Sequence, residues 1–130
     1  QSLSKTASGG EMSRIMLALK SAQAKKTGAG TVIFDEIDTG VSGGTSERIG
    51  IKLRELSKGA QVICVTHSAQ VAAHAHQHLL IEKKEVDGRA ESSVRALAME
   101  ERIGELARII GGIEVTENQY TAAKELLKNI

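Results

Sequence analysis

The chain has 130 residues, of which 41% are hydrophobic and 25% are charged, as in an ordinary soluble globular protein. A net charge of +1 and only one Phe, one Tyr and no Trp argue against a strongly basic or base-stacking nucleic-acid surface. The single cysteine, Cys64, cannot form an internal disulfide, and no apolar run approaches the roughly 20 residues of a membrane span. Both features favour a cytoplasmic protein without a membrane partner. Because the chain opens on Gln1 and Ser2 without an initiator Met, we expect a segment of a longer protein.

Helical and β-rich stretches alternate along the first half of the chain. Met12, Ile15, Met16 and Leu19 recur at three- and four-residue steps, which predicts a helix over residues 8–26. Short β-rich runs predict buried strands at 31–36 and 61–67. The segment between these strands carries Ile49, Leu53 and Leu56 at helical spacing, and Ser68 can cap a short helix after the second strand.

The second half of the chain predicts a hairpin followed by helices. Asp87-Gly88 is a strong turn signal within a predicted hairpin over 78–98. Helices are predicted over 99–129, interrupted at Gly111-Gly112, with a capping box from Thr116 to Gln119. We therefore expect an α/β fold, with a largely parallel sheet flanked by helices, a β-hairpin and C-terminal helices, as one lobe over 1–130.

Polar residues that could carry chemistry follow both predicted strands. Ligands of parallel sheets bind beyond the carboxyl ends of the strands, where Asp35-Glu36 and Thr66-His67 fall. One carboxylate could hold Mg²⁺ through water while the other activates a water. Taken alone, however, such a pair is more often a solvated strand end. His67 could donate to a phosphoryl group or be a structural histidine.

The helix that begins near Ser8 has a second candidate feature. Glycines at a helix start leave backbone N–H groups free for phosphate, and Ser8-Gly9-Gly10-Glu11 has this form. The same residues also form an S-x-x-E capping box, so a plain helix cap is the alternative. His74, His76 and His78 alternate and are interpreted as structural, without a zinc site. The basic residues Arg14, Lys20, Lys25 and Lys26 are interpreted chiefly as a solvated helix surface rather than a DNA contact.

The order and spacing of these motifs resemble the C-terminal half of an ABC-type ATPase. Ala7-Ser8-Gly9-Gly10-Glu11 resembles the signature motif, Val32-Ile33-Phe34-Asp35-Glu36 the Walker B strand, and Val65-Thr66-His67 the switch histidine. Residues 3–20, 34–43, 66–73 and 101–112 are similar to the RecN family, bacterial SMC-like DNA repair ATPases. Ser68-Ala69 departs from the Leu-Pro usual in that family, which predicts a looser start to the following helix.

The resemblance implies ATP hydrolysis at a homodimer interface. It implies that Ser8, Gly9, Gly10 and Glu11 contact the partner's nucleotide, that Asp35 holds Mg²⁺, and that Glu36 and His67 are catalytic. Asp38, Ser42 and Gly43 would form a loop at the dimer interface. The family resemblance further implies DNA double-strand-break repair and recombination by the full-length protein, in the cytoplasm and at the bacterial nucleoid.

The chain contains no G-x-x-x-x-G-K-[ST] phosphate-binding loop. We therefore expect the isolated chain to bind ATP poorly and not to hydrolyse it, with the Walker A lobe and a coiled coil upstream. Two other functions remain open: a nucleotide-binding subunit of an ABC transporter, and a non-catalytic dimerisation module. The Ser-Gly-Gly-Glu-Met-Ser-Arg sequence, and Ser42 where transporters carry Asp, argue against the transporter.

Overall fold

The computed structural model describes residues 9–28, 30–41, 43–128 and 130. It divides the chain into two compact units, an N-terminal unit that ends at His74 and a C-terminal unit that begins at Ala75. The prediction that residues 1–130 are one lobe of a larger ATPase head stays a prediction. No Pro-rich or low-complexity linker lies between the two units. Predictions for Ser8 and Ser42 fall outside the described residues.

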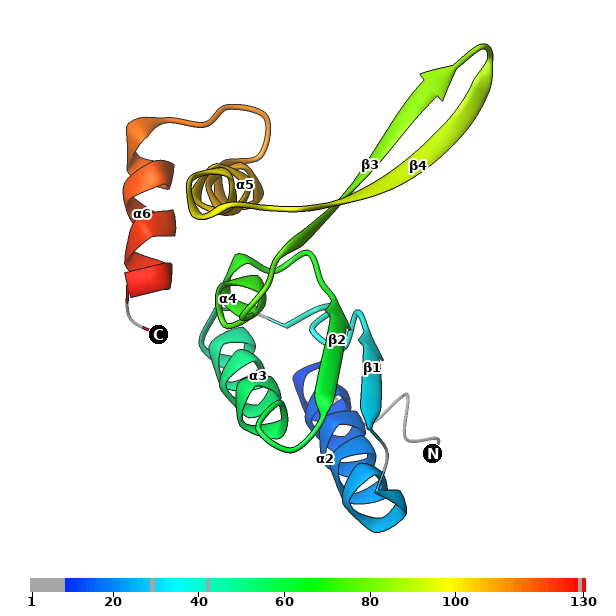
Figure 1. Cartoon of the computed structure of the whole chain (residues 1–130). Helices are drawn as coiled ribbons and strands as arrows, with labels where there is room; N and C mark the ends of the chain where they lie inside the picture. Colours follow the sequence, from blue (N-terminus) through cyan, green and yellow to red (C-terminus); the bar gives the residue numbers. More distant parts are fainter. Residues whose placement is uncertain (1–8, 29, 42, 129) are drawn as a thin grey trace. The chain divides into compact units, whose positions relative to one another are not determined.

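The N-terminal unit is a two-stranded parallel sheet with helices, as the α/β prediction required (Figure 1). Strands β1 (Thr31–Asp35) and β2 (Gln61–Val65) pair in register, with Thr31 opposite Gln61 and Asp35 opposite Val65. A parallel pair needs a crossover, and helix α3 (Gly43–Leu56) supplies it. Helix α2 (Gly9–Thr27) precedes β1, and helix α4 (Ala69–Ala73) follows β2.

One face of this sheet forms the core of the N-terminal unit. Val32 and Phe34 alternate along β1 and are buried, and Val62 and Cys64 lie opposite them on β2. Helices contribute the remaining buried members of this core, which are Leu17 of α2, Ile49 and Leu53 of α3, and Val71 of α4. The helical spacing seen in the sequence therefore marks faces that are buried against the sheet.

The other face of the sheet is apolar and exposed. Ile33, Ile63 and Val65 are 56%, 43% and 39% exposed. The sequence predicted buried strands because consecutive apolar residues, Val32-Ile33-Phe34 and Val62-Ile63-Cys64-Val65, occupy the middle of each run. Within the described residues, however, the helices of the N-terminal unit cover one side only.

Local signals placed several element ends correctly. Ser68 is the N-cap of α4, and its hydroxyl accepts a hydrogen bond from the Val71 N–H. The predicted Ser68 cap is therefore confirmed, and the looser helix start expected from the departure from Leu-Pro stays a prediction. Gly50 of α3 has no room for a side chain, because a Cβ there would lie 2.4 Å from the His74 ring.

The C-terminal unit contains a hairpin and two helices. Strands β3 (Leu79–Val86) and β4 (Arg89–Ala96) are antiparallel and joined by Asp87-Gly88, both with positive φ, as the turn signal predicted. Helices α5 (Met99–Gly111) and α6 (Glu117–Lys128) pack together and bury Leu106, Ala107 and Ala123. Gly112 ends α5 with a φ of 68°, at the predicted break. In the described part of the chain, no helix is both long and apolar enough to cross a membrane.

Candidate functional site

Glu36 directly follows β1 and has a left-handed backbone. Its φ is 52°, a conformation that costs a residue with a side chain about 1–2 kcal/mol. Three hydrogen bonds hold it there. The Glu36 N–H donates to the Val65 carbonyl at 2.8 Å, and the Glu36 carbonyl accepts from the N–H and the hydroxyl of Thr39 at 3.3 and 2.9 Å. Strained residues held in this way concentrate at functional sites.

His67 follows β2 and contacts the Glu36 side chain. His67 Nε2 lies 3.0 Å from Glu36 Oε1. The two side chains are 89% and 47% exposed, so the pair is open to solvent and to a ligand. A solvent-exposed side-chain contact of this kind adds little stability, which makes it more informative about chemistry than about folding. The parallel strands therefore bring together the two residues that the sequence predicted to be catalytic.

Asp35, the predicted magnesium ligand, is the last residue of β1 and is exposed. Among the described residues, no three or more His, Cys, Asp or Glu side chains are grouped so that they could hold a metal ion. Mg²⁺ typically uses one or two carboxylates and completes its shell with water and substrate phosphates. An exposed carboxylate at the end of a strand is compatible with this kind of site, and it does not fit a closed structural metal site.

Asp38 and Thr66 form a polar contact beside the Glu36–His67 pair. The Thr66 hydroxyl donates to Asp38 Oδ2 at 2.5 Å and accepts from the Ser68 N–H at 2.9 Å. Asp38 is only 8% exposed. The sequence predicted Asp38 at a dimer interface, and in the structure its carboxylate faces a residue of its own chain. The sequence interpretation assigned no role to Thr66.

The signature residues are described only in part. Helix α2 begins at Gly9, so Gly9 and Gly10 form its first turn, as predicted for the glycines of this motif. Ser8 and the Glu11 side chain lie outside what the structure describes. Lys20, further along α2, donates to the Ile33 carbonyl at 2.5 Å, and its Nζ lies 5.1 Å from the centre of the Phe34 ring. These contacts tie α2 to β1, a role that the sequence did not indicate.

Three other residues considered in the sequence, Gly43, His74 and Cys64, belong to the N-terminal unit. Gly43 is the exposed first residue of α3. His74 is buried, with Nε2 3.4 Å from Glu47 Oε1, and so has a structural partner. Cys64 lies on the core face of β2, and burial, with smaller contributions from Asp38 and Asp35, raises the pKa of its thiol to about 12. Cys64 is therefore a protonated, unreactive thiol at neutral pH.

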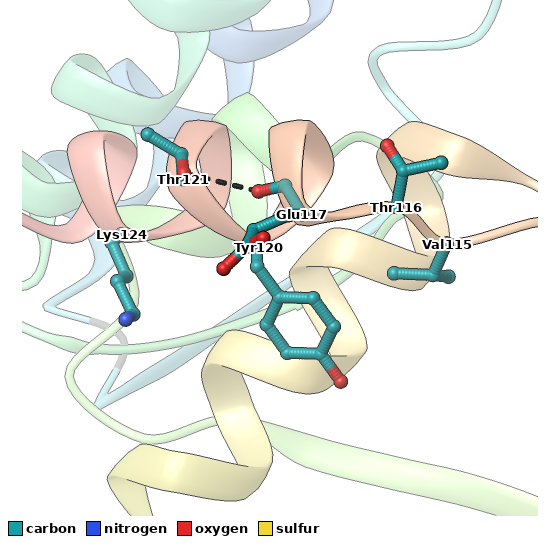
Figure 2. Close-up of a pocket in the computed structure, with 6 residues that line it drawn as sticks. All are labelled: Val115, Thr116, Glu117, Tyr120, Thr121 and Lys124. Atoms are coloured by element: carbon teal, nitrogen blue, oxygen red, sulfur yellow. Dashed lines mark hydrogen bonds between the residues drawn. The ribbon is translucent and has the colours of Figure 1, made fainter.

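The C-terminal unit contains a shallow pocket of its own (Figure 2). It lies over the start of α6, where the Thr121 hydroxyl donates to the Glu117 carbonyl at 3.0 Å. None of its lining residues was predicted as a site residue; they are Val115, Thr116, Glu117, Tyr120, Thr121 and Lys124.

Solved structures define the class of this fold as that of SMC ATPase heads. A structure from work on ATP-driven dimerization and DNA-stimulated activation of SMC ATPases aligns with a TM-score of 0.65 and 28% identity, covering 85% of this chain and 66% of that one. The SMC head domain from Thermotoga maritima aligns with a TM-score of 0.57 and 31% identity, covering 76% and 36%. The predicted α/β head fold is therefore confirmed.

Sequence relatives identify the particular protein that this segment resembles. The DNA repair protein RecN of Halalkalibacterium halodurans is 55% identical over 96% of the chain, and RecN of Bacillus subtilis is 49% identical over 98%. The predicted resemblance to RecN is thus confirmed. The chain spans about a fifth of the length of these relatives, 22% in both cases. No protein-family model matches the chain.

Proposed function

We propose that this chain is part of the ATP-hydrolysing head of a bacterial protein that repairs DNA double-strand breaks by recombination. The observation that carries the proposal is the Glu36–His67 pair, placed beyond the carboxyl ends of adjacent parallel strands. The similarity to RecN and to SMC heads supports the same activity. It favours a DNA repair ATPase over the nucleotide-binding subunit of a transporter.

The proposed chemistry assigns each polar residue a separate task. Glu36 accepts the proton of the attacking water, because its carboxylate is exposed and its backbone is held rigidly by Val65 and Thr39. The His67 imidazole orients the Glu36 carboxylate through their contact. The same imidazole would face the γ-phosphate. Asp35 would hold Mg²⁺ through water, and the ion would neutralise phosphate charge.

The proposed site is completed by a second copy of the protein. Ser8, Gly9, Gly10 and Glu11 would contact the nucleotide bound to the partner subunit, where the first turn of α2 offers free backbone N–H groups to phosphate. Gly43, with Ser42 and Asp38 nearby in sequence, would lie at the same interface. The full-length protein would therefore form a homodimer through ATP held between its heads.

The rest of the protein supplies what this chain lacks. We propose that an upstream lobe brings the Walker A loop and that a coiled coil joins the two parts of the head. DNA would be bound by the full-length protein in the cytoplasm, at the nucleoid. Since the 130 residues contain no Walker A sequence, we expect the isolated chain to show no ATP hydrolysis.

The test is a complementation assay with the full-length protein. Glu36→Gln and Ser8→Arg are each expected to abolish ATP hydrolysis, since one removes the base and the other blocks the signature. Mixed dimers keep one composite site intact, so a mixture of the two variants should recover part of the activity. Two inactive variants that stay inactive when mixed would refute action in trans. Wild-type hydrolysis by Glu36→Gln would refute the catalytic proposal and favour a non-catalytic dimerisation module.

A further inference from the structure

We propose that Thr66 and Asp38 are positioning residues that hold His67 against Glu36. The inference rests on the proposed ATPase function and adds to it a pair of residues that need not touch the substrate. Its basis is the hydrogen bond from the Thr66 hydroxyl to Asp38 Oδ2, which links the two loops that carry the proposed catalytic residues.

The bonds around Thr66 determine the backbone on both sides of His67. The Thr66 hydroxyl accepts from the Ser68 N–H at 2.9 Å, which closes a short turn with His67 at its centre. The same hydroxyl donates its proton to Asp38 at 2.5 Å. One hydroxyl therefore both shapes the His67 turn and anchors it to the opposite loop.

His67 needs such an anchor because packing cannot direct its ring. Its side chain is 89% exposed, and its one described side-chain contact is with Glu36. The direction of the imidazole is then set largely by the backbone at residues 66–68. A reacting group displaced by about 1 Å can lose on the order of a hundredfold in rate.

Asp38 is suited to be the fixed end of this contact. Its side chain is 8% exposed, and Ile37, its neighbour in the chain, belongs to the buried core. Glu36, two residues before Asp38, is fixed by its own bonds to Val65 and Thr39. The loop after β1 is thus a rigid platform, and Thr66 aligns the loop after β2 with it.

The experiment compares ATP hydrolysis of full-length variants in two backgrounds. Thr66→Val removes the hydroxyl at nearly constant volume and is expected to lower kcat about tenfold while KM for ATP changes less than about twofold. Asp38→Asn should keep part of the contact and lower kcat less than Asp38→Ala does. Thr66→Ser should restore kcat. Thr31→Val is the matched control: its hydroxyl bonds Gln61 at the far end of the same strand pair, and kcat should not change.

Repeating Thr66→Val in a His67→Ala background separates positioning from general stability. If Thr66 acts through His67, the second substitution should change kcat by less than about twofold there. The same tenfold loss in both backgrounds would overturn the inference, as would wild-type kcat in Thr66→Val. In either case, an inactive Glu36→Gln leaves the proposed function standing. If Glu36→Gln is fully active, the function itself fails.

Discussion

The left-handed backbone of Glu36 predicts that two inactivating substitutions at this position, to glycine and to alanine, differ in stability. Glu36→Gly removes the proposed base, so ATP hydrolysis by the full-length protein should be lost. The same change relieves the conformational cost of a φ of 52°. Glycine at this position should therefore leave the head more stable than alanine does, although both substitutions make it inactive.

The magnitude follows from three contributions. Relief of the left-handed conformation stabilises by about 1–2 kcal/mol, and the greater freedom of glycine in the unfolded chain offsets about 0.5–1 kcal/mol. The exposed contact with His67 is worth at most about 1 kcal/mol and is lost equally in Glu36→Ala. Alanine keeps the cost of the left-handed backbone. The free energy of unfolding should therefore be roughly 0.5–1 kcal/mol higher for Glu36→Gly than for Glu36→Ala.

Urea unfolding of the head in the full-length protein measures this difference. Lys52 provides the control because it lies exposed within α3, where Gly should be about 1 kcal/mol less stable than Ala. The order of Gly and Ala should thus reverse between the two positions. If Glu36→Ala is as stable as Glu36→Gly or more so, the backbone at residue 36 is not strained and the reasoning is refuted.

Two further predictions concern the core of the N-terminal unit. Gly50→Ala should destabilise by about 1–3 kcal/mol, because the added Cβ would lie 2.4 Å from the buried His74 ring; Gly59→Ala, with open space around it, should be nearly neutral in the same urea titration. Burial raises the pKa of the Cys64 thiol from 9.0, its ordinary value, to about 12, so the folded state retains a proton that the unfolded state loses as pH rises above 9. Stability should therefore fall above pH 9 more steeply in the wild type than in Cys64→Ala, by up to about 1.4 kcal/mol per pH unit, and identical slopes would contradict the burial of this thiol.

Sequence patterns predicted the elements well where local chemistry determines them. The Ser68 cap, the Asp87-Gly88 turn and the break at Gly112 depend on residues adjacent in the chain, and all three are present. The apolar spacing of α3 likewise marked Ile49 and Leu53, which are buried.

The candidate site was predictable only as far as topology determines it. The ends of β1 and β2 are neighbours in any parallel pair, so Glu36 and His67 were expected at one edge. The Thr66–Asp38 contact joins side chains 28 residues apart and depends on their rotamers. The strain at Glu36 is also absent from the sequence pattern, because neither Gly nor Asn marks the position.

The one-sided cover of the β1–β2 sheet has a practical consequence for handling the protein. Wherever Ile33, Ile63 and Val65 remain exposed, they form an apolar surface that favours self-association. Hydrophobic association of this kind weakens on cooling and strengthens in sulfate or phosphate. Cold, sulfate-free buffers are accordingly the conditions in which this segment should stay dispersed. Ammonium sulfate should precipitate this segment at a lower salt concentration than its modest overall hydrophobicity would indicate.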